Sequence, residues 1–182
     1  MIKIENLTVR YDKVVLDNFN MHFPQTGVFC IYAPSGTGKT TLLNAIAGLV
    51  KYSGRIEVNG RISYLFQEDR LLNWLTARQN VMLLEPTCDA AQKYIEAFGI
   101  LEYENEMPQN LSGGMKRRVA LARTLAYDAD IYLLDEPFKG LDEDNVKKVQ
   151  NEINFLAQNK LVLVVTHDPQ DTVELNAKKV LL

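Results

Sequence analysis

Cysteine is scarce in this sequence: the 182 residues include only Cys30 and Cys88, whose spacing fits no metal site. We expect both to be reduced structural thiols, as in a cytosolic protein. An excess of either sign of charge is missing too, since 20 Lys and Arg against 23 Asp and Glu give a net charge of only −3. A charge this small gives no general attraction for nucleic acid, and we expect no nucleic acid as a partner.

Long apolar stretches are also missing. The longest runs, such as Leu161–Val165, fall far short of the roughly 18 residues that a membrane span requires. The N-terminal sequence MIKIENLTVR lacks the apolar stretch of a secretory signal. An apolar fraction of 47% and a charged fraction of 24% are ordinary for a globular protein. We therefore expect a single cytoplasmic domain over residues 1–182, without a membrane span of its own.

The first third of the chain alternates short β-type runs with turns. Asn59-Gly60 is a strong two-residue turn signal, so it predicts a hairpin between the fourth and fifth runs. In chain order, the runs are Ile2–Val9, Val14–Phe23, Val28–Ala33, Arg55–Val58 and Ile62–Phe66.

The rest of the chain indicates helices and then buried strands. About residues 70–125 have helical character, including a helix that Asp89 can cap. Farther on, Ile131–Leu134 and Leu161–Thr166 are continuous apolar runs typical of parallel strands covered on both faces, with a helix capped by Asp142 between them. These patterns predict an α/β fold with an antiparallel β subdomain, a helical insertion and a parallel core.

A phosphate-binding loop is the clearest motif. The strand Val28–Tyr32 precedes it and a helix follows, which is the setting of the pattern G-x-x-x-x-G-K-S/T, here with alanine at the first glycine. Glycines let backbone N–H groups converge on phosphate oxygens, the lysine supplies a cation, and the next hydroxyl can bind Mg²⁺. The loop, which predicts a site for ATP with Mg²⁺, comprises Ala33, Pro34, Ser35, Gly36, Thr37, Gly38, Lys39, Thr40 and Thr41.

Two carboxylates, Asp135 and Glu136, end the apolar run Ile131–Leu134. Beside a phosphate loop, Asp135 would hold Mg²⁺ directly or through water, and Glu136 would polarise the attacking water. Taken alone, the pair could equally be a surface acidic pair at the end of a strand.

A second glycine-rich segment, Leu111-Ser-Gly-Gly-Met115, opens a helix. Ser112 is a good N-cap, and the two glycines allow an anion to approach the helix N-terminus closely. Taken alone, the segment could also be a flexible loop before a capped helix.

Together these motifs resemble the nucleotide-binding subunit of ABC transporters, over nearly the whole chain. The resemblance implies a P-loop NTPase core of the ABC type. It also gives roles to residues that mean little alone. Tyr11 would stack on adenine, Gln67 would contact the Mg²⁺ and water side, Asp142 would belong to the D-loop, and His167 would be the switch histidine.

What the resemblance implies for function is an ATPase that works as a pair of copies, or as a heterodimer with a second ABC chain. The phosphate loop of one chain and the segment Ser112, Gly113, Gly114 and Met115 of the other would enclose each ATP. The implied catalytic residues are Glu136, His167 and Gln67, and the implied Mg²⁺ ligands are Thr40, Gln67 and Asp135.

Two further features resemble the branch of this family that imports nitrate, taurine and alkanesulfonates. They are Met115 and the stretch Phe66–Thr76, in which Asn73 stands where proline is usual. The implied partners are integral membrane permease subunits and, indirectly, an extracytoplasmic solute-binding protein. The chain would then lie at the inner face of the cell membrane.

Other interpretations remain open at this point. A soluble ABC-type ATPase with a non-transport partner is the main alternative. An ordinary phosphate-loop kinase or GTPase is the second, but the guanine-reading N-K-x-D motif of a GTPase is missing, because Leu161-Val162 follows Asn159-Lys160. The apolar cluster after Gln67 either fills the core or forms a groove for a permease helix. Its members are Leu71, Leu72, Trp74 and Leu75.

Overall fold

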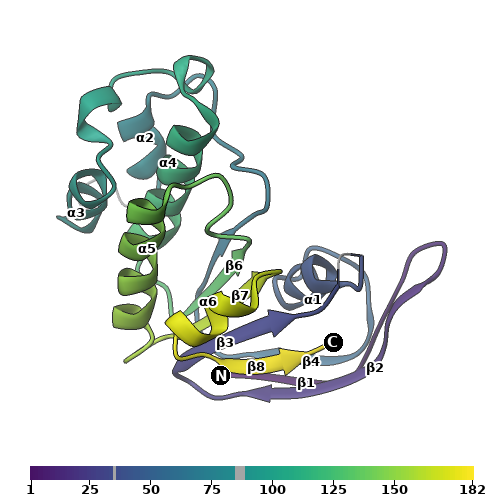
Figure 1. Cartoon of the computed structure of the whole chain (residues 1–182). Helices are drawn as coiled ribbons and strands as arrows, with labels where there is room; N and C mark the ends of the chain where they lie inside the picture. The colour runs from purple at the N-terminus through teal and green to yellow at the C-terminus, as the bar shows by residue number, and fades with distance from the viewer. Residues whose placement is uncertain (35, 85–88) are drawn as a thin grey trace.

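The computed structural model describes residues 1–34, 36–84 and 89–182, and its strands are divided between two sheets (Figure 1). The smaller sheet is antiparallel, in the order β2-β1-β4. Its central strand buries Ile2 and Ile4 by simple alternation. A register shift at Asn6, whose φ is +52°, moves the next buried positions to Leu7 and Val9. The bounds are β1 (Ile2–Arg10), β2 (Val14–Phe23) and β4 (Ser53–Val58).

The larger sheet is parallel, in the order β5-β6-β7-β3-β8. Every residue of β6 and β7 is buried, as the continuous apolar runs predict for strands covered on both faces. The bounds are β3 (Gly27–Tyr32), β5 (Ile62–Leu65), β6 (Ile131–Asp135), β7 (Leu161–Thr166) and β8 (Lys178–Leu181).

Alternate residues of the parallel strands point into two separate cores. Phe29 and Ile31 of β3 pack with the antiparallel sheet and with α1 (Lys39–Ile46). Their neighbours Val28 and Cys30 pack on the opposite side, with the remaining helices. The sheet is therefore held between two apolar layers.

Cys30 is a buried free thiol, as predicted. Burial raises its pKa to about 11, so it carries little thiolate near neutral pH and is unreactive. Cys88 lies outside the described residues.

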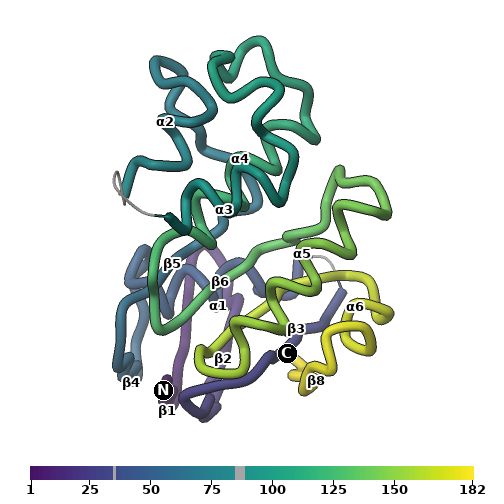
Figure 2. The backbone as a smooth tube through the Cα atoms, turned by 90° about the vertical axis from the view of Figure 1, so that its left-hand side faces the viewer, coloured from purple at the N-terminus to yellow at the C-terminus, as the bar shows by residue number. Residues whose placement is uncertain are grey.

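The helices from α2 to α4 gather at the end of the molecule away from the antiparallel sheet (Figures 1 and 2). Among these helices, α3 begins at Asp89. It ends before Gly99, whose φ of +63° lets the N–H of Ile100 donate back to the carbonyl of Ile95. No helix among the described residues is long and apolar enough to cross a membrane. The bounds are α2 (Ala77–Val81), α3 (Asp89–Ala97), two 3-10 turns (Leu101–Tyr103 and Pro108–Asn110), α4 (Gly113–Ala126), α5 (Glu143–Leu156) and α6 (Pro169–Glu174).

The hairpin predicted at Asn59-Gly60 is wrong. Strand β4 belongs to the antiparallel sheet, whereas β5 pairs with β6 in the parallel sheet, so the turn carries the chain from one sheet to the other. The Asp130 carboxylate accepts a hydrogen bond of 2.8 Å from the N–H of Arg61. A contact distant in sequence therefore outweighs the local turn signal.

Substitution of Gly60 tests this crossing. Its φ is +125°, and a Cβ there would lie 2.6 Å from the Cβ of Asp130. Gly60→Ala should lower the free energy of unfolding by about 2–4 kcal/mol, from backbone strain and overlap together. The matched control Gly48→Ala, with φ +70° and open space around it, should cost only about 1 kcal/mol. Urea denaturation measures both, and equal losses would contradict the close contact with Asp130.

Candidate nucleotide-binding site

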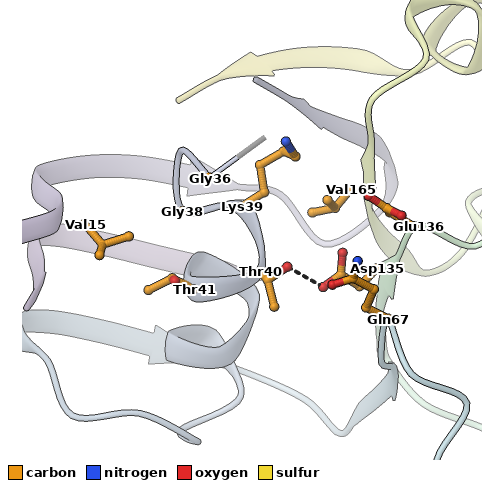
Figure 3. A pocket seen from close by; sticks show the side chains of 10 residues that line it. All are labelled: Val15, Gly36, Gly38, Lys39, Thr40, Thr41, Gln67, Asp135, Glu136 and Val165. Carbon is orange, nitrogen blue, oxygen red and sulfur yellow. Dashed lines mark hydrogen bonds between the residues drawn. The ribbon is translucent and has the colours of Figure 1, made fainter. Parts of the chain in front are cut away.

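A cavity of about 350 Å³ lies between the loop after β3 and the end of β6 (Figure 3). The carboxyl ends of parallel strands share one edge of the sheet, so three strands supply the site. Strand β3 leads into the loop, β6 ends in Asp135, and β7 ends just before His167. The cavity is lined by Val15, Gly36, Gly38, Lys39, Thr40, Thr41, Gln67, Asp135, Glu136 and Val165.

Lys39 is the first residue of α1 and the main cation lining this cavity. Its Nζ donates hydrogen bonds to the carbonyl oxygens of Ala33 (2.5 Å) and Pro34 (2.9 Å). The Thr37 hydroxyl also donates to the Pro34 carbonyl, at 2.7 Å. The loop thus curves around the ammonium group, beside the positive end of the helix dipole. This combination of a cation and a helix N-terminus suits an anion such as a phosphate chain.

Backbone geometry explains which positions of the loop need glycine. Gly38 has φ +99°, and a Cβ there would lie 2.9 Å from Cγ1 of Val15, so both conformation and space exclude larger residues. Gly36 has φ +80°. Ala33 does not adopt a positive φ, which is why alanine is compatible with the first position of the motif. Ser35, also predicted to bind ATP, lies outside the described residues.

Asp135 and Thr40 join the two halves of the cavity, since the Thr40 hydroxyl donates a hydrogen bond of 2.7 Å to Oδ2 of Asp135. Asp135 is only 1% exposed. Burial raises the pKa of its carboxyl, and the hydrogen bond from Thr40 acts in the opposite direction. Because the folded-state pKa is raised, this group stabilises the protein at low pH and loses that contribution as pH rises through the folded pKa. The ionised carboxylate is therefore costly here.

Glu136 projects from a backbone with φ +48°, a conformation that costs a non-glycine residue about 1–2 kcal/mol. Its carboxylate lies 3.7 Å from Nδ1 of His167 and 3.9 Å from Nζ of Lys139. The His167 side chain is largely exposed, whereas that of Glu136 is mostly buried. The structure thus brings two of the three predicted catalytic side chains together, and the third, Gln67, lines the same cavity as Glu136.

The other predicted residues lie outside this cavity. Tyr11 is 56% exposed at the turn between β1 and β2, and its adenine contact stays a prediction. Asp142 caps α5, accepting a 2.9 Å hydrogen bond from the N–H of Asn145. This bond also lowers the pKa of the Asp142 carboxyl.

The segment Ser112–Met115 forms the start of α4, where the Ser112 hydroxyl accepts a hydrogen bond from the N–H of Met115 at 3.3 Å. The predicted cap is confirmed. Gly113 lines a second cavity of about 220 Å³, which shares Gln67 with the first. None of the four residues of the segment lines the first cavity, which holds Lys39.

Sequence reasoning missed Arg117, which binds the backbone at the end of β6. A signal was available, because Leu121 and Thr124 share its face of α4 at helical spacing and are buried. A charged residue on the buried face of a helix requires polar partners, so the sequence could have predicted a buried, hydrogen-bonded arginine here, although not which groups it binds.

Comparisons with known proteins agree with this geometry. The ABC transporter family model matches residues 16–139. An uncharacterized ABC transporter ATP-binding protein of Methanocaldococcus jannaschii is 36% identical over 205 residues, covering 100% of this chain and 77% of that protein. The chain belongs to the ABC transporter family. It is an ABC-type ATP-binding subunit and an ATPase.

Other ABC relatives carry more informative names. The aliphatic sulfonates import ATP-binding protein SsuB of Bacillus subtilis is 36% identical, over 92% of this chain and 72% of that protein. The nitrate import ATP-binding protein NrtD of Synechocystis is 37% identical, over 88% of this chain and 67% of that protein. A dimeric ATP-binding cassette solved in a post-hydrolysis state with ADP and phosphate has a TM-score of 0.87 and 29% identity, over 96% of this chain and 91% of that one.

Lys39→Ala tests the phosphate loop of this ABC protein. Loss of the ammonium should weaken Mg²⁺-ATP binding by more than about tenfold, because charge-assisted hydrogen bonds to phosphate are lost. Titration with a fluorescent ATP analogue measures this. Lys51→Ala, which removes the same charge from a separate surface cavity, should bind as the unsubstituted protein does. Equal affinities for the two variants would remove Lys39 from the site.

Proposed function

We propose that the chain is a single ATP-binding domain over residues 1–182 and the ATP-hydrolysing subunit of an ABC importer. ATP-driven closure of two copies would drive a separate membrane permease between its inward- and outward-facing states. One observation carries the proposal: Lys39, Asp135 and Glu136 share a cavity, whereas the segment Ser112–Met115 lies outside it. A second copy is then needed to complete the site.

Each group in the cavity has a proposed part. Lys39 and the N-terminus of α1 would hold the phosphates, and Tyr11 would stack on adenine. Thr40, Gln67 and Asp135 would hold Mg²⁺, and their all-oxygen donor set fits this hard cation. Mg²⁺ would neutralise the charge that develops on the phosphates, and it would also offset the cost of the buried Asp135 carboxylate.

Hydrolysis would depend on residues at the edge of the cavity. Glu136 would orient and polarise the attacking water, and His167, 3.7 Å from its carboxylate, would contact the γ-phosphate in the closed pair. The glycines at the start of α4 would approach the same phosphate from the partner copy. The dimeric form of the ADP-bound relative supports this arrangement.

The importer assignment rests on the chain's likeness to SsuB and NrtD and on one exposed surface. The apolar cluster after Gln67 is divided between its two interpretations. Leu71 packs against the core, as a core residue would, whereas Trp74 is 72% exposed, as a residue of a partner surface would be. Large exposed aromatics are typical anchors of protein interfaces. We propose that Trp74 contacts a permease at the inner face of the cell membrane, with an extracytoplasmic solute-binding protein supplying the solute.

Glu136→Gln tests the catalytic assignment. It should leave ATP binding intact and slow hydrolysis by about 100-fold or more, because the water loses its polarising carboxylate. It should also let ATP hold two copies together, since turnover no longer empties the closed dimer. Size-exclusion chromatography with Mg²⁺-ATP measures the dimer, and Glu143→Gln on the exposed start of α5 is the control. A monomeric, normally active Glu136→Gln protein would refute the assignment.

Trp74→Ala tests the partner surface. Since the side chain is largely exposed, the variant should fold and hydrolyse ATP normally, yet lose co-purification with an integral membrane permease from native membranes. Phe155→Ala, which removes a 61% exposed aromatic from α5, should keep the permease. If the unsubstituted chain co-purifies with no polytopic membrane protein, a soluble ABC-type ATPase becomes the better interpretation.

A further inference from the structure

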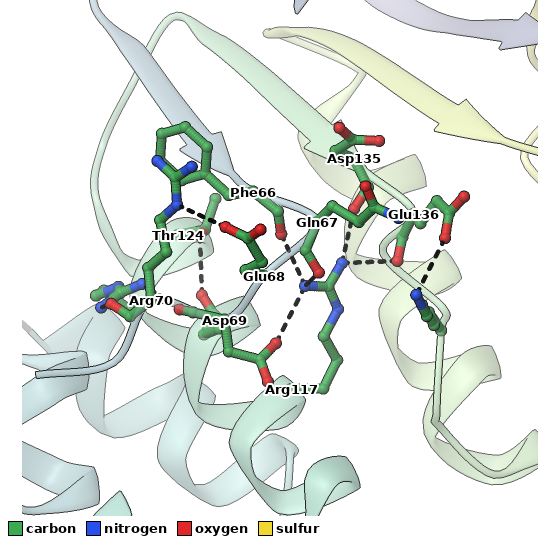
Figure 4. A network of polar contacts seen from close by, with 12 residues as sticks. Phe66, Gln67, Glu68, Asp69, Arg70, Arg117, Thr124, Asp135 and Glu136 are labelled. Carbon is green, nitrogen blue, oxygen red and sulfur yellow. Dashed lines mark hydrogen bonds and ion pairs between the residues drawn. The ribbon is translucent and has the colours of Figure 1, made fainter. Parts of the chain in front are cut away.

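Arg117 is a buried charged residue to which the roles described above give no part. It lies in the first half of α4, is 3% exposed, and each end of its guanidinium faces a different segment (Figure 4). Nη1 donates to the carbonyl oxygens of Phe66 (2.9 Å) and Gln67 (3.5 Å). Nη2 donates to the carbonyl oxygens of Asp135 (2.7 Å) and Glu136 (2.6 Å). A single planar group therefore joins the segment Phe66–Arg70, called the glutamine segment below, to the end of β6.

Burying a guanidinium removes its charge from water, and this desolvation cost must be offset by an opposite charge and by hydrogen bonds. Asp69, from the glutamine segment, supplies an ion pair with Nη1 at 3.2 Å. Burial lowers the pKa of Arg117, and the hydrogen bond and charge of Asp69 act against this shift. Nε has no hydrogen-bond partner in the part of the chain that the structure describes. A residue that served only to fill space here would be apolar, so the contacts of the two terminal nitrogens are the feature to explain.

The backbone at Glu136 is the part of the site that most needs support. The backbone has a positive φ, and its N–H donates to the carbonyl of Val165 at 2.9 Å. Its own carbonyl accepts from Nη2 of Arg117 at 2.6 Å and, at the longer distance of 3.2 Å, from the N–H of Lys139. Without the shorter, charge-assisted bond from Arg117, only the bond from Lys139 holds this carbonyl, so the peptide after Glu136 can rotate toward a less strained conformation and the carboxylate moves with it.

We propose that Arg117 is a positioning residue for ATP hydrolysis, fixing the Glu136 carboxylate relative to Gln67 by bridging the two backbone segments. It does not touch ATP and acts through Glu136, so the inference rests on the proposed role of that residue. The bridge requires the planar fork of a guanidinium. A lysine ammonium keeps the charge but concentrates its donors on one atom.

A nearby arginine offers a matched control. Arg123, six residues farther along α4, donates to the carbonyl oxygens of Asp69 (2.8 Å) and Arg70 (2.9 Å). It thus anchors the same glutamine segment, and neither of these hydrogen bonds reaches the end of β6. Comparing the two arginines separates support of the segment from positioning of the carboxylate.

The experiment compares Arg117→Lys, Arg117→Met and Arg123→Met in the full chain, by steady-state ATP hydrolysis and by ATP titration. Both Arg117 variants should lower kcat by about tenfold to a hundredfold, the scale of a catalytic group displaced by about 1 Å, while the Kd for ATP changes less than about threefold. Arg123→Met should keep kcat within about threefold of the unsubstituted protein. Glu136→Gln is measured in parallel.

The outcomes are distinct. Normal kcat in Arg117→Lys overturns the bridging role, and so does a parallel fall of kcat in Arg123→Met. If Arg117→Met fails to fold, as a thermal melt would show, Arg117→Lys decides alone. Failure of both to fold overturns the proposal in favour of a structural role. If Glu136→Gln hydrolyses ATP normally, the proposed function of Glu136 fails first, whatever the Arg117 variants do.

Discussion

The parallel alignment of β3, β7 and β6 is the constraint on which the nucleotide site depends. Because the three strands run in one direction, the phosphate loop, His167 and the carboxylate pair emerge at the same edge of the sheet. The hydrogen bond between Thr40 and Asp135 then joins the loop to β6, across the intervening β7. A shift in the register of one strand would separate Thr40 from Asp135, which are 95 residues apart in sequence but adjacent in space.

The site is assembled at a local cost that the surrounding packing offsets. Asp135 and Arg117 are charged and almost fully buried, and Glu136 adopts an unfavourable backbone conformation. Apolar layers on both faces of the sheet supply the compensating stability. Such local conflicts are expected where residues are placed for chemistry rather than for folding.

The sequence predicted the features that depend on local pattern. Buried strands, the Ser112 and Asp142 caps and the glycine positions of the phosphate loop all follow from nearby residues, and the structure contains them. The Asn59-Gly60 turn was misassigned because Asp130 and β6, far along the chain, determine where β5 pairs. Arg117 was missed for the same reason, since its partners lie on segments that only tertiary packing brings together.

The hydrogen bonds of Lys39 to the Ala33 and Pro34 carbonyls have a consequence for selectivity. An ammonium group has three N–H donors, so these two carbonyls leave one donor for a phosphate oxygen and hold the side chain in one direction. A chain of phosphates can engage both this donor and the N-terminus of α1, which favours a polyphosphate over free phosphate.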